Sequence, residues 1–138
     1  MSTTFSKEEK AAMRAAAAEA KAAKQGADLE AACLTAITEM TGTDKQLAET
    51  LHQLIKKHTS LAAKTWYGMP AYIDADGKVV VFFQAASKFK VRYATIGFQP
   101  DANLDEGNFW PNAYAVTKLT AADQKRLVAL LKQAVSEA

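Results

Sequence analysis

Hydrophobic residues recur at helical spacing in two stretches of the N-terminal half of the chain. The first stretch begins at Asp28 and ends at Gly42, and the second follows a cap at Thr43 or Asp44 and runs to about His58. The stripes consist of Leu29, Cys33, Ala36, Ile37 and Met40, and of Leu47, Leu51, Leu54 and Ile55. Each stripe is typical of the buried face of an amphipathic helix. We therefore expect two helices, joined by a short loop, that pack as an antiparallel pair.

A further helical segment comes before these two and has few large apolar residues. Ser6, followed three residues later by Glu9, is typical of a helix N-cap, and an Ala, Glu, Lys and Arg run continues to about Lys24. Gln25-Gly26 predicts the end of this helix, because glycine is favoured just after a helix C-terminus. The larger apolar side chains of the segment are Phe5 and Met13. We therefore expect a loosely attached or frayed helix.

From Thr65 onward the pattern becomes that of extended chain. Trp66-Tyr67 and Ala71-Tyr72-Ile73 are predicted to be short strands that flank a Gly68-Met69-Pro70 bend, from which Met69 should project. Asp74 to Gly77 predicts a tight turn into the strand Lys78 to Gln84. That strand is apolar on both faces, so it is predicted to be central in the sheet.

The later strands have weaker patterns. Phe89 to Phe98 is predicted to be a strand with apolar residues on one face and with Lys90 and Arg92 on the other, until the phase slips near Ala94-Thr95. After a polar loop, an edge strand is predicted from Tyr114 to about Lys118. A last helix, capped by Thr120 with Asp123, presents the apolar residues Leu127, Leu130, Leu131, Ala134 and Val135.

The order of these elements predicts an α+β fold. Two or three N-terminal helices and a C-terminal helix should pack on a curved antiparallel sheet of about five strands. No internal repeat and no linker between two domains is apparent. We expect residues 1–27 to form an N-terminal helical extension and residues 28–138 to form a single α+β domain.

Composition narrows the class of protein. The chain has 138 residues, of which 49% are hydrophobic and 23% charged, as in an ordinary globular domain. The net charge of +2 argues against nucleic acid as a partner. The single cysteine, Cys33, excludes an internal disulfide, and neither a secretory leader nor a run of 18 apolar residues is apparent. We expect a cytoplasmic protein with no membrane partner, either a monomer or a homodimer.

Three segments resemble the YdhG-like bacterial proteins, a domain of unknown function. They are Thr65 to Tyr72, Gly77 to Phe83 and Lys88 to Tyr93, and Trp110-Pro111 is typical of one branch. The resemblance covers about residues 28 to 136 and implies one α+β domain with helices against a curved antiparallel sheet. It supplies no catalytic residues. Some relatives are described as frataxin-like iron chaperones, so the resemblance also implies iron as a ligand.

One group of residues has the composition of a ligand site. Aromatic and sulfur-bearing side chains could line an apolar pocket with hydroxyl and indole donors, and cations on a nearby strand could hold a phosphate or carboxylate. The candidate ligand-binding residues are Trp66, Tyr67, Met69, Tyr72, Lys88, Lys90, Arg92, Tyr93 and Trp110. The alternatives are that the aromatic residues fill the core and that the cations lie on a solvated sheet face.

Other chemistry has less support in the sequence. Iron would require hard oxygen ligands, and Asp101, Asp105 and Glu106 form the only acidic cluster in the polar loop; a solvated loop is the alternative. No nucleophile, phosphate-loop or zinc pattern occurs, so no catalytic residue and no metal ligand is assigned. Three functions remain open: a non-enzymatic binding protein for a small anionic or amphipathic molecule or a peptide, a frataxin-like iron chaperone, or an enzyme that uses Tyr67 or Tyr93 as an acid.

Overall fold

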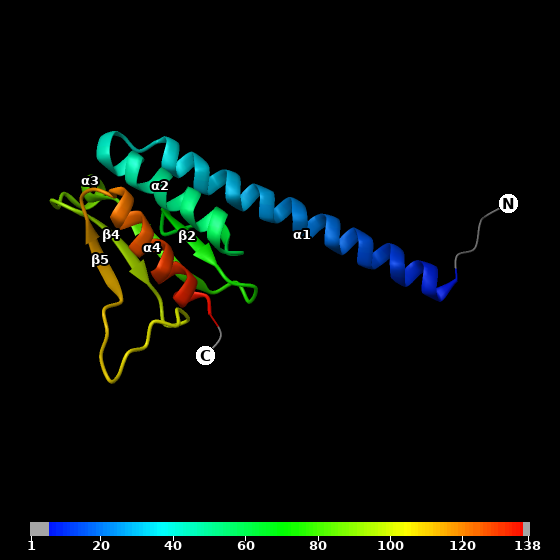
Figure 1. Cartoon of the computed structure of the whole chain (residues 1–138). Helices are drawn as coiled ribbons and strands as arrows, with labels where there is room; N and C mark the ends of the chain where they lie inside the picture. Colours follow the sequence, from blue (N-terminus) through cyan, green and yellow to red (C-terminus); the bar gives the residue numbers. More distant parts are fainter. Residues whose placement is uncertain (1–5, 137–138) are drawn as a thin grey trace.

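The computed structural model describes residues 6–136, apart from the side chain of Ala22. It contains four helices and five strands within this range (Figure 1). The elements are α1 (Lys7–Thr38), α2 (Gly42–His58), β1 (Ala62–Trp66), β2 (Met69–Ile73), β3 (Val79–Gln84), α3 (Ala86–Phe89), β4 (Ala94–Phe98), β5 (Ala113–Val116) and α4 (Ala121–Ala134). The predicted α+β class, with helices packed on a five-stranded antiparallel sheet, is confirmed.

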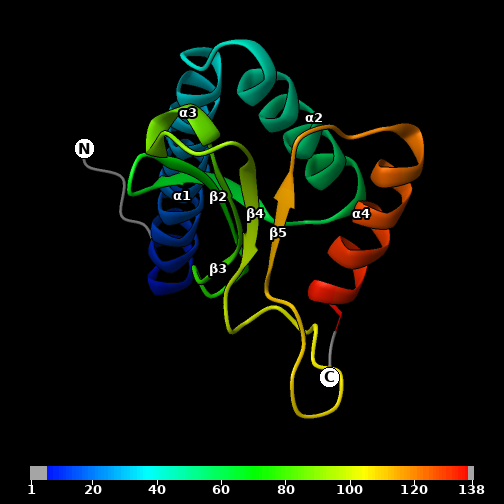
Figure 2. The same cartoon turned by 90° about the vertical axis from the view of Figure 1, so that its left-hand side faces the viewer.

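The sheet is a simple antiparallel meander in which each strand pairs with the next along the chain. The strand order is β1-β2-β3-β4-β5, so β3 is central and β5 lies at an edge, both as predicted. Figure 2 shows the strands side by side, with α2 and α4 on one side of the sheet and α3 near the upper end of the strands.

One face of the sheet forms the hydrophobic core together with the helices. On this face Tyr72, Val81 and Phe98 stand side by side across β2, β3 and β4, because they are partners in the strand register. The helices contribute Cys33 and Ile37 from α1, Leu47, Leu51 and Ile55 from α2, and Leu127 and Leu131 from α4. The predicted apolar stripes of these helices are therefore largely confirmed, although Leu29 and Val135 are exposed.

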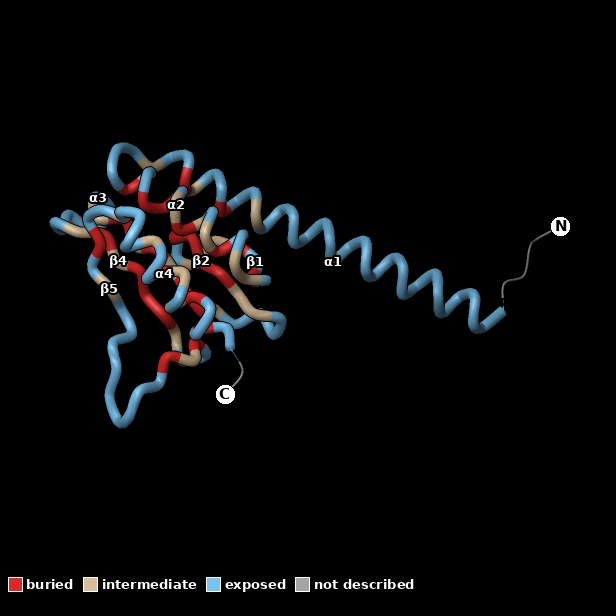
Figure 3. The backbone as a smooth tube through the Cα atoms, in the orientation of Figure 1, coloured by how far each residue is buried: buried red, intermediate tan, exposed pale blue. Residues whose placement is uncertain are grey.

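The predicted break at Gln25-Gly26 is wrong, because α1 continues through both residues. Glycine costs roughly 1 kcal/mol in a helix interior, and the strong helix formers on both sides outweigh that cost. The predicted N-cap is confirmed, since the Ser6 hydroxyl accepts a hydrogen bond of 3.1 Å from the Glu9 amide. Every described side chain from Ser6 to Leu29 is exposed, so this half of the helix extends away from the rest of the chain (Figure 3). Phe5 lies outside the described residues.

The predicted strand from Phe89 to Phe98 is also partly wrong. Its first residue ends the short helix α3, Lys90 has a left-handed backbone conformation with φ of 54°, and the strand β4 begins only at Ala94. The predicted slip in phase near Ala94-Thr95 is the start of this strand. Lys90 and Arg92 therefore do not alternate along a sheet face.

The residues that were expected to cap the second helix have another partner. α2 begins at Gly42, with Thr41 as its cap residue. The Asp44 carboxylate instead accepts hydrogen bonds from the Ala86 amide at 2.9 Å, the Ser87 amide at 3.1 Å and the Ser87 hydroxyl at 2.6 Å. Asp44 thus holds the N-terminus of α3, which is 42 residues away in the chain.

The two remaining turns follow the predictions more closely. The Asp74 side chain accepts hydrogen bonds from the Asp76 and Lys78 amides and closes the turn before β3. Thr120 and Asp123 form the reciprocal capping box at the start of α4. The edge strand runs from Ala113 to Val116, slightly earlier than predicted. None of the described helices has both the length and the apolar composition that crossing a bilayer requires.

Candidate functional site

The sheet face opposite the helices carries a group of large side chains at the β1–β2 hairpin. Trp66 pairs with Met69 across the hairpin, and Lys64 pairs with Ala71, which in turn pairs with Phe82 of β3. Because side chains alternate along a strand, these residues all point away from Tyr72, Val81 and the core. Trp66, Lys64 and Phe82 are half-buried on this open face.

The aromatic rings on this face pack on one another and on a glycine. The Trp66 ring lies 5.4 Å from that of Phe82 and 5.0 Å from that of Tyr67, centroid to centroid, with tilted and edge-on geometry. Such arrangements are favoured by the quadrupoles of the rings. The Phe82 ring lies directly over Gly97, where a Cβ atom would overlap it. The lack of a side chain at Gly97 therefore lets the Phe82 ring lie flat against the sheet.

The tip of the hairpin is a two-residue turn with both residues in the left-handed region. Tyr67 has φ of 50° and Gly68 has φ of 76°, as a type I′ turn requires. The prediction that Met69 projects from a bend is wrong, since Met69 belongs to β2 and is 9% exposed. Instead Tyr67 projects, with 82% of its surface exposed. The turn therefore presents a tyrosine to solvent next to Trp66.

Lys88 of α3 fixes the position of this tip. Its Nζ donates a hydrogen bond of 3.2 Å to the Tyr67 carbonyl oxygen and lies over Gly68. An ammonium group has three N–H donors, so two remain for another acceptor. We call Lys64, Trp66, Tyr67, Met69, Phe82 and Lys88 the hairpin surface.

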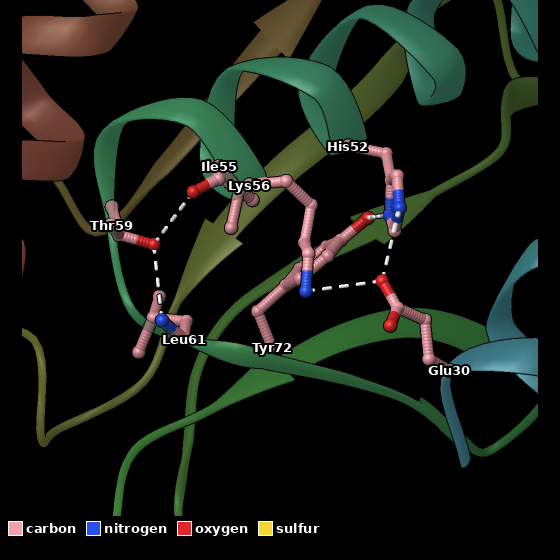
Figure 4. Close-up of polar contacts among 7 residues, drawn as sticks. All are labelled: Glu30, His52, Ile55, Lys56, Thr59, Leu61 and Tyr72. Carbon is pink, nitrogen blue, oxygen red and sulfur yellow. Dashed lines mark hydrogen bonds and ion pairs between the residues drawn. The ribbon is translucent and has the colours of Figure 1, made fainter. Parts of the chain in front are cut away.

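Tyr72, another candidate, lies on the opposite side of the sheet and is fully buried. Its hydroxyl is 3.0 Å from Nδ1 of His52, and Nε2 of His52 is 3.8 Å from Glu30, which also pairs with Lys56 at 3.1 Å (Figure 4). Burial, with Cys33 beside the hydroxyl, raises the pKa of Tyr72. The protonated phenol can therefore donate to a neutral His52.

The buried position of this group decides what it can do. Burial is the main effect that lowers the pKa of His52, and it also raises the pKa of the Cys33 thiol. A tyrosine, a histidine and a glutamate in sequence resemble a proton relay, but a substrate cannot reach a hydroxyl with no exposed surface. The group satisfies the hydrogen bonding of a buried phenol, which is a structural role.

The remaining candidates are not part of the hairpin surface. Lys90 is the C-cap residue of α3. Arg92, in the loop that follows, lies 5.2 Å from the ring of Tyr93. Arg92 and Tyr93 line a cavity with Asp44, and Trp110 lines another in the loop between β4 and β5. The sequence reasoning did not single out Phe82. Its alternation with the inward-facing Val81 and Phe83 was the signal that could have identified it.

The residues proposed for iron lie in the loop that follows β4. Asp101 is 3.7 Å from Lys78, and Asp105 lines the same cavity as Trp110. Among residues 6–136, no three His, Cys, Asp or Glu side chains lie close enough together to hold a metal ion. Iron binding therefore rests on the family resemblance alone.

The fold and the site define an α+β domain with one sheet face packed on helices and an aromatic and cationic hairpin on the other face. Comparison with known protein families, with curated proteins and with solved structures found no match. The resemblance to the YdhG-like proteins stays a prediction from the residues that carry it.

Proposed function

We propose that this protein is a binding module that uses the hairpin surface to hold an acidic segment of another protein. The observation that carries the proposal is the exposed Tyr67 beside Trp66 and beside a lysine ammonium with two unused donors. Tyrosine and tryptophan are the residues that most often dominate the binding energy of protein interfaces. A peptide with a carboxylate next to an apolar side chain matches both features, because the carboxylate can accept from the Lys88 ammonium and the apolar side chain can pack on the aromatic rings.

The charges on the open face favour an acidic partner. The strand register places twelve residues on this face, and none of them is acidic. They are Ala62, Lys64, Trp66, Met69, Ala71, Ile73, Phe82, Gln84, Thr95, Gly97, Ala113 and Ala115. Complementary charge guides association and excludes partners of the same sign.

The shape of the surface favours a peptide over a small metabolite. Small-molecule sites are concave and enclose most of the ligand. Four cavities on the described chain have linings that include neither Tyr67, Trp66 nor Lys88. Tyr67, with 82% of its surface exposed, projects from the hairpin, and aromatic residues are enriched where proteins contact one another.

The proposal can be tested by nuclear magnetic resonance with two synthetic peptides. One peptide alternates Glu with Phe and the other alternates Lys with Phe. We expect the acidic peptide alone to shift the amide signals of residues 64–69, 71 and 88. Tyr67→Ala and Lys88→Gln should each weaken its binding, by roughly tenfold for an aromatic contact worth about 1.4 kcal/mol.

Phe109→Ala provides a matched control, because Phe109 is 92% exposed and lies outside the hairpin surface. This variant should bind the acidic peptide as the unchanged protein does. The proposal is wrong if neither peptide shifts these signals, if both peptides bind equally, or if the shifts map to the cavities instead.

A further inference from the structure

The N-terminal half of α1 is a helix without a partner in the fold. Its described side chains are exposed as far as Leu29, and α1 contacts the rest of the structure only from there on, mainly through β1. In Figure 3 this half stands away from the sheet and the other helices. An exposed helix can be stable without packing when strong helix formers fill it, as the alanine-rich sequence does here.

The cations of this half lie on one side of the helix. At 100° per residue, all five fall within an arc of about 100°. They are Lys7, Lys10, Arg14, Lys21 and Lys24. At 1.5 Å per residue they form a stripe of about 26 Å along the axis. We call these five residues the basic stripe.

The carboxylates of α1 are mostly on the other side. Relative to Lys7, Glu8 and Glu19 lie at about 100° and 120°, and Glu9 lies at about 200°. Asp28 is the exception, because it falls on the arc of the basic stripe, about one turn beyond Lys24, at the end nearest the sheet. The charges of the exposed half are therefore separated into two faces.

The basic stripe also has no internal counterion. Within residues 6–136, none of its five cations lies within 4.0 Å of a carboxylate, whereas Lys56, Lys78 and His52 in the body of the protein each do. A cation without an internal partner is available to an external anion.

We infer that the basic stripe binds the phosphate backbone of nucleic acid, without sequence preference. A duplex presents about one negative charge per 1.7 Å along its axis, so a straight stripe of cations can contact several phosphates at once. Lysines, which supply four of the five cations, contact phosphates whatever the base, and for bidentate contacts to base edges the helix has, besides them, no asparagine, one arginine (Arg14) and one glutamine (Gln25). The net charge of +2 is low, but the separation of charge on α1 presents five cations locally.

Other occupants fit the basic stripe less well. A helix that lies in a membrane surface needs large apolar residues opposite its cations, and the exposed half has only Met13 and Leu29, neither of them opposite the basic stripe. A second copy of the chain would have to supply an acidic face, and each copy offers only three glutamates spread over about 100° of arc. Phosphate backbones supply the continuous negative charge that the stripe matches.

The experiment measures binding of the full chain to a fluorescein-labelled DNA duplex of mixed sequence by fluorescence anisotropy across a salt series. With all five cations engaged, the logarithm of Kd should rise with the logarithm of salt concentration with a slope of about 4.5. K10Q/R14Q/K21Q leaves two cations and should reduce the slope to about 2. At low salt this variant should bind at least tenfold more weakly.

Two controls distinguish binding by the basic stripe from binding by exposed cations elsewhere on the protein. K57Q/K125Q/K132Q removes three exposed cations from α2 and α4 and should leave the slope unchanged. A second variant exchanges three cations with alanines on the far face (K10A/A12K, R14A/A16R, K21A/A23K), which keeps composition and net charge. It should lose binding as the neutralised variant does, and circular dichroism should show the same helix content in both.

Three results would overturn the inference. The first is no binding of the duplex at low salt, and the second is equal loss of binding in the two neutralised variants. The third is that K10Q/R14Q/K21Q leaves duplex binding unchanged but abolishes another interaction. That interaction would be either a dimer seen by analytical ultracentrifugation or binding to phosphatidylserine vesicles.

Discussion

Tyr67 has a backbone conformation that suits glycine or asparagine better than tyrosine. Its φ of 50° lies in the left-handed region, which costs roughly 1 kcal/mol or more for most residues. Its side chain is also 82% exposed, so burial of the ring does not offset this cost. Strained and exposed residues concentrate at binding sites. The left-handed backbone conformation distinguishes Tyr67 from Phe109, which is even more exposed.

Tyr67→Asn should therefore stabilise the fold and weaken binding. Asparagine tolerates the left-handed region, so we expect the free energy of unfolding to rise by about 1 kcal/mol and Tm by roughly 3 °C. The affinity for the acidic peptide should fall at the same time, since the ring is lost. Thermal unfolding and the peptide titration measure the two effects. An unchanged or lower Tm would contradict the assignment of strain.

At the scale of elements, the short helix α3 depends on contacts that are distant in sequence. Four residues are too few for a stable helix on their own. The Asp44 carboxylate accepts three hydrogen bonds from its first turn, and Lys88 connects its last turn to the β1–β2 hairpin. α3 thus joins α2 to the hairpin surface.

Asp44→Ala should destabilise the protein more than Ser87→Ala. The aspartate change leaves the amides of Ala86 and Ser87 without this acceptor, and hydrogen bonds to a charged group are worth about 1.5–3 kcal/mol. Ser87→Ala removes only the hydroxyl donor, and we expect about 1 kcal/mol. Urea denaturation gives both values. Equal losses would show that the amides are not held by Asp44.

For the whole molecule, stability should depend on pH through His52. Burial lowers its pKa below the ordinary value, and Glu30 offsets this only in part. Below about pH 6.5 the unfolded chain therefore binds a proton that the folded chain does not, and the free energy of unfolding decreases as pH falls. Above that pH both states are neutral at this site and the dependence disappears. Each unit of pKa difference corresponds to about 1.4 kcal/mol.

Urea denaturation at pH 7.5, 6.5 and 5.5 and constant ionic strength measures this dependence. His52→Gln should flatten the profile between pH 7 and 5, whatever its effect on stability at pH 7.5. Asp44 acts in a different range. Although its partial burial raises the pKa, hydrogen bonds from Ser87 and Ala86 lower it overall, so its contribution is lost only below about pH 4. An equal slope in His52→Gln would assign the dependence to another group.

The fold could be predicted from sequence where short-range pattern decides the structure. The stripes that contain Cys33 and Leu51 follow from the helical period, and β3 follows from a short run of β-branched and aromatic residues after a turn. The failures have a common cause. The break at Gly26 was predicted from one residue against the preference of all its neighbours, and α3 requires a carboxylate 42 residues away.

The candidate site was harder to predict because its residues, like the contacts of α3, meet only in the folded chain. Trp66 and Tyr67 were found because they are close together in the sequence, whereas Phe82 joins them only through strand pairing. Tyr72 is an aromatic residue of the same short segment as Trp66, but the alternation of side chains along β2 places it in the core. Composition identifies residues that can form a site, and register decides which of them meet.

The continuity of α1 through Gly26 also fixes a distance. The helix is held at Cys33 and Ile37 and packs against β1, the first strand of the hairpin, while Lys7 stands about 39 Å beyond Cys33. The chain would then be bivalent, with a protein segment at one end and a phosphate backbone at the other. A helix keeps such a separation nearly constant, whereas a flexible linker would let it vary. A protein bound at the hairpin surface would experience a high effective concentration of nucleic acid bound at the basic stripe. This holds only where the two ligands can be separated by the length of the helix.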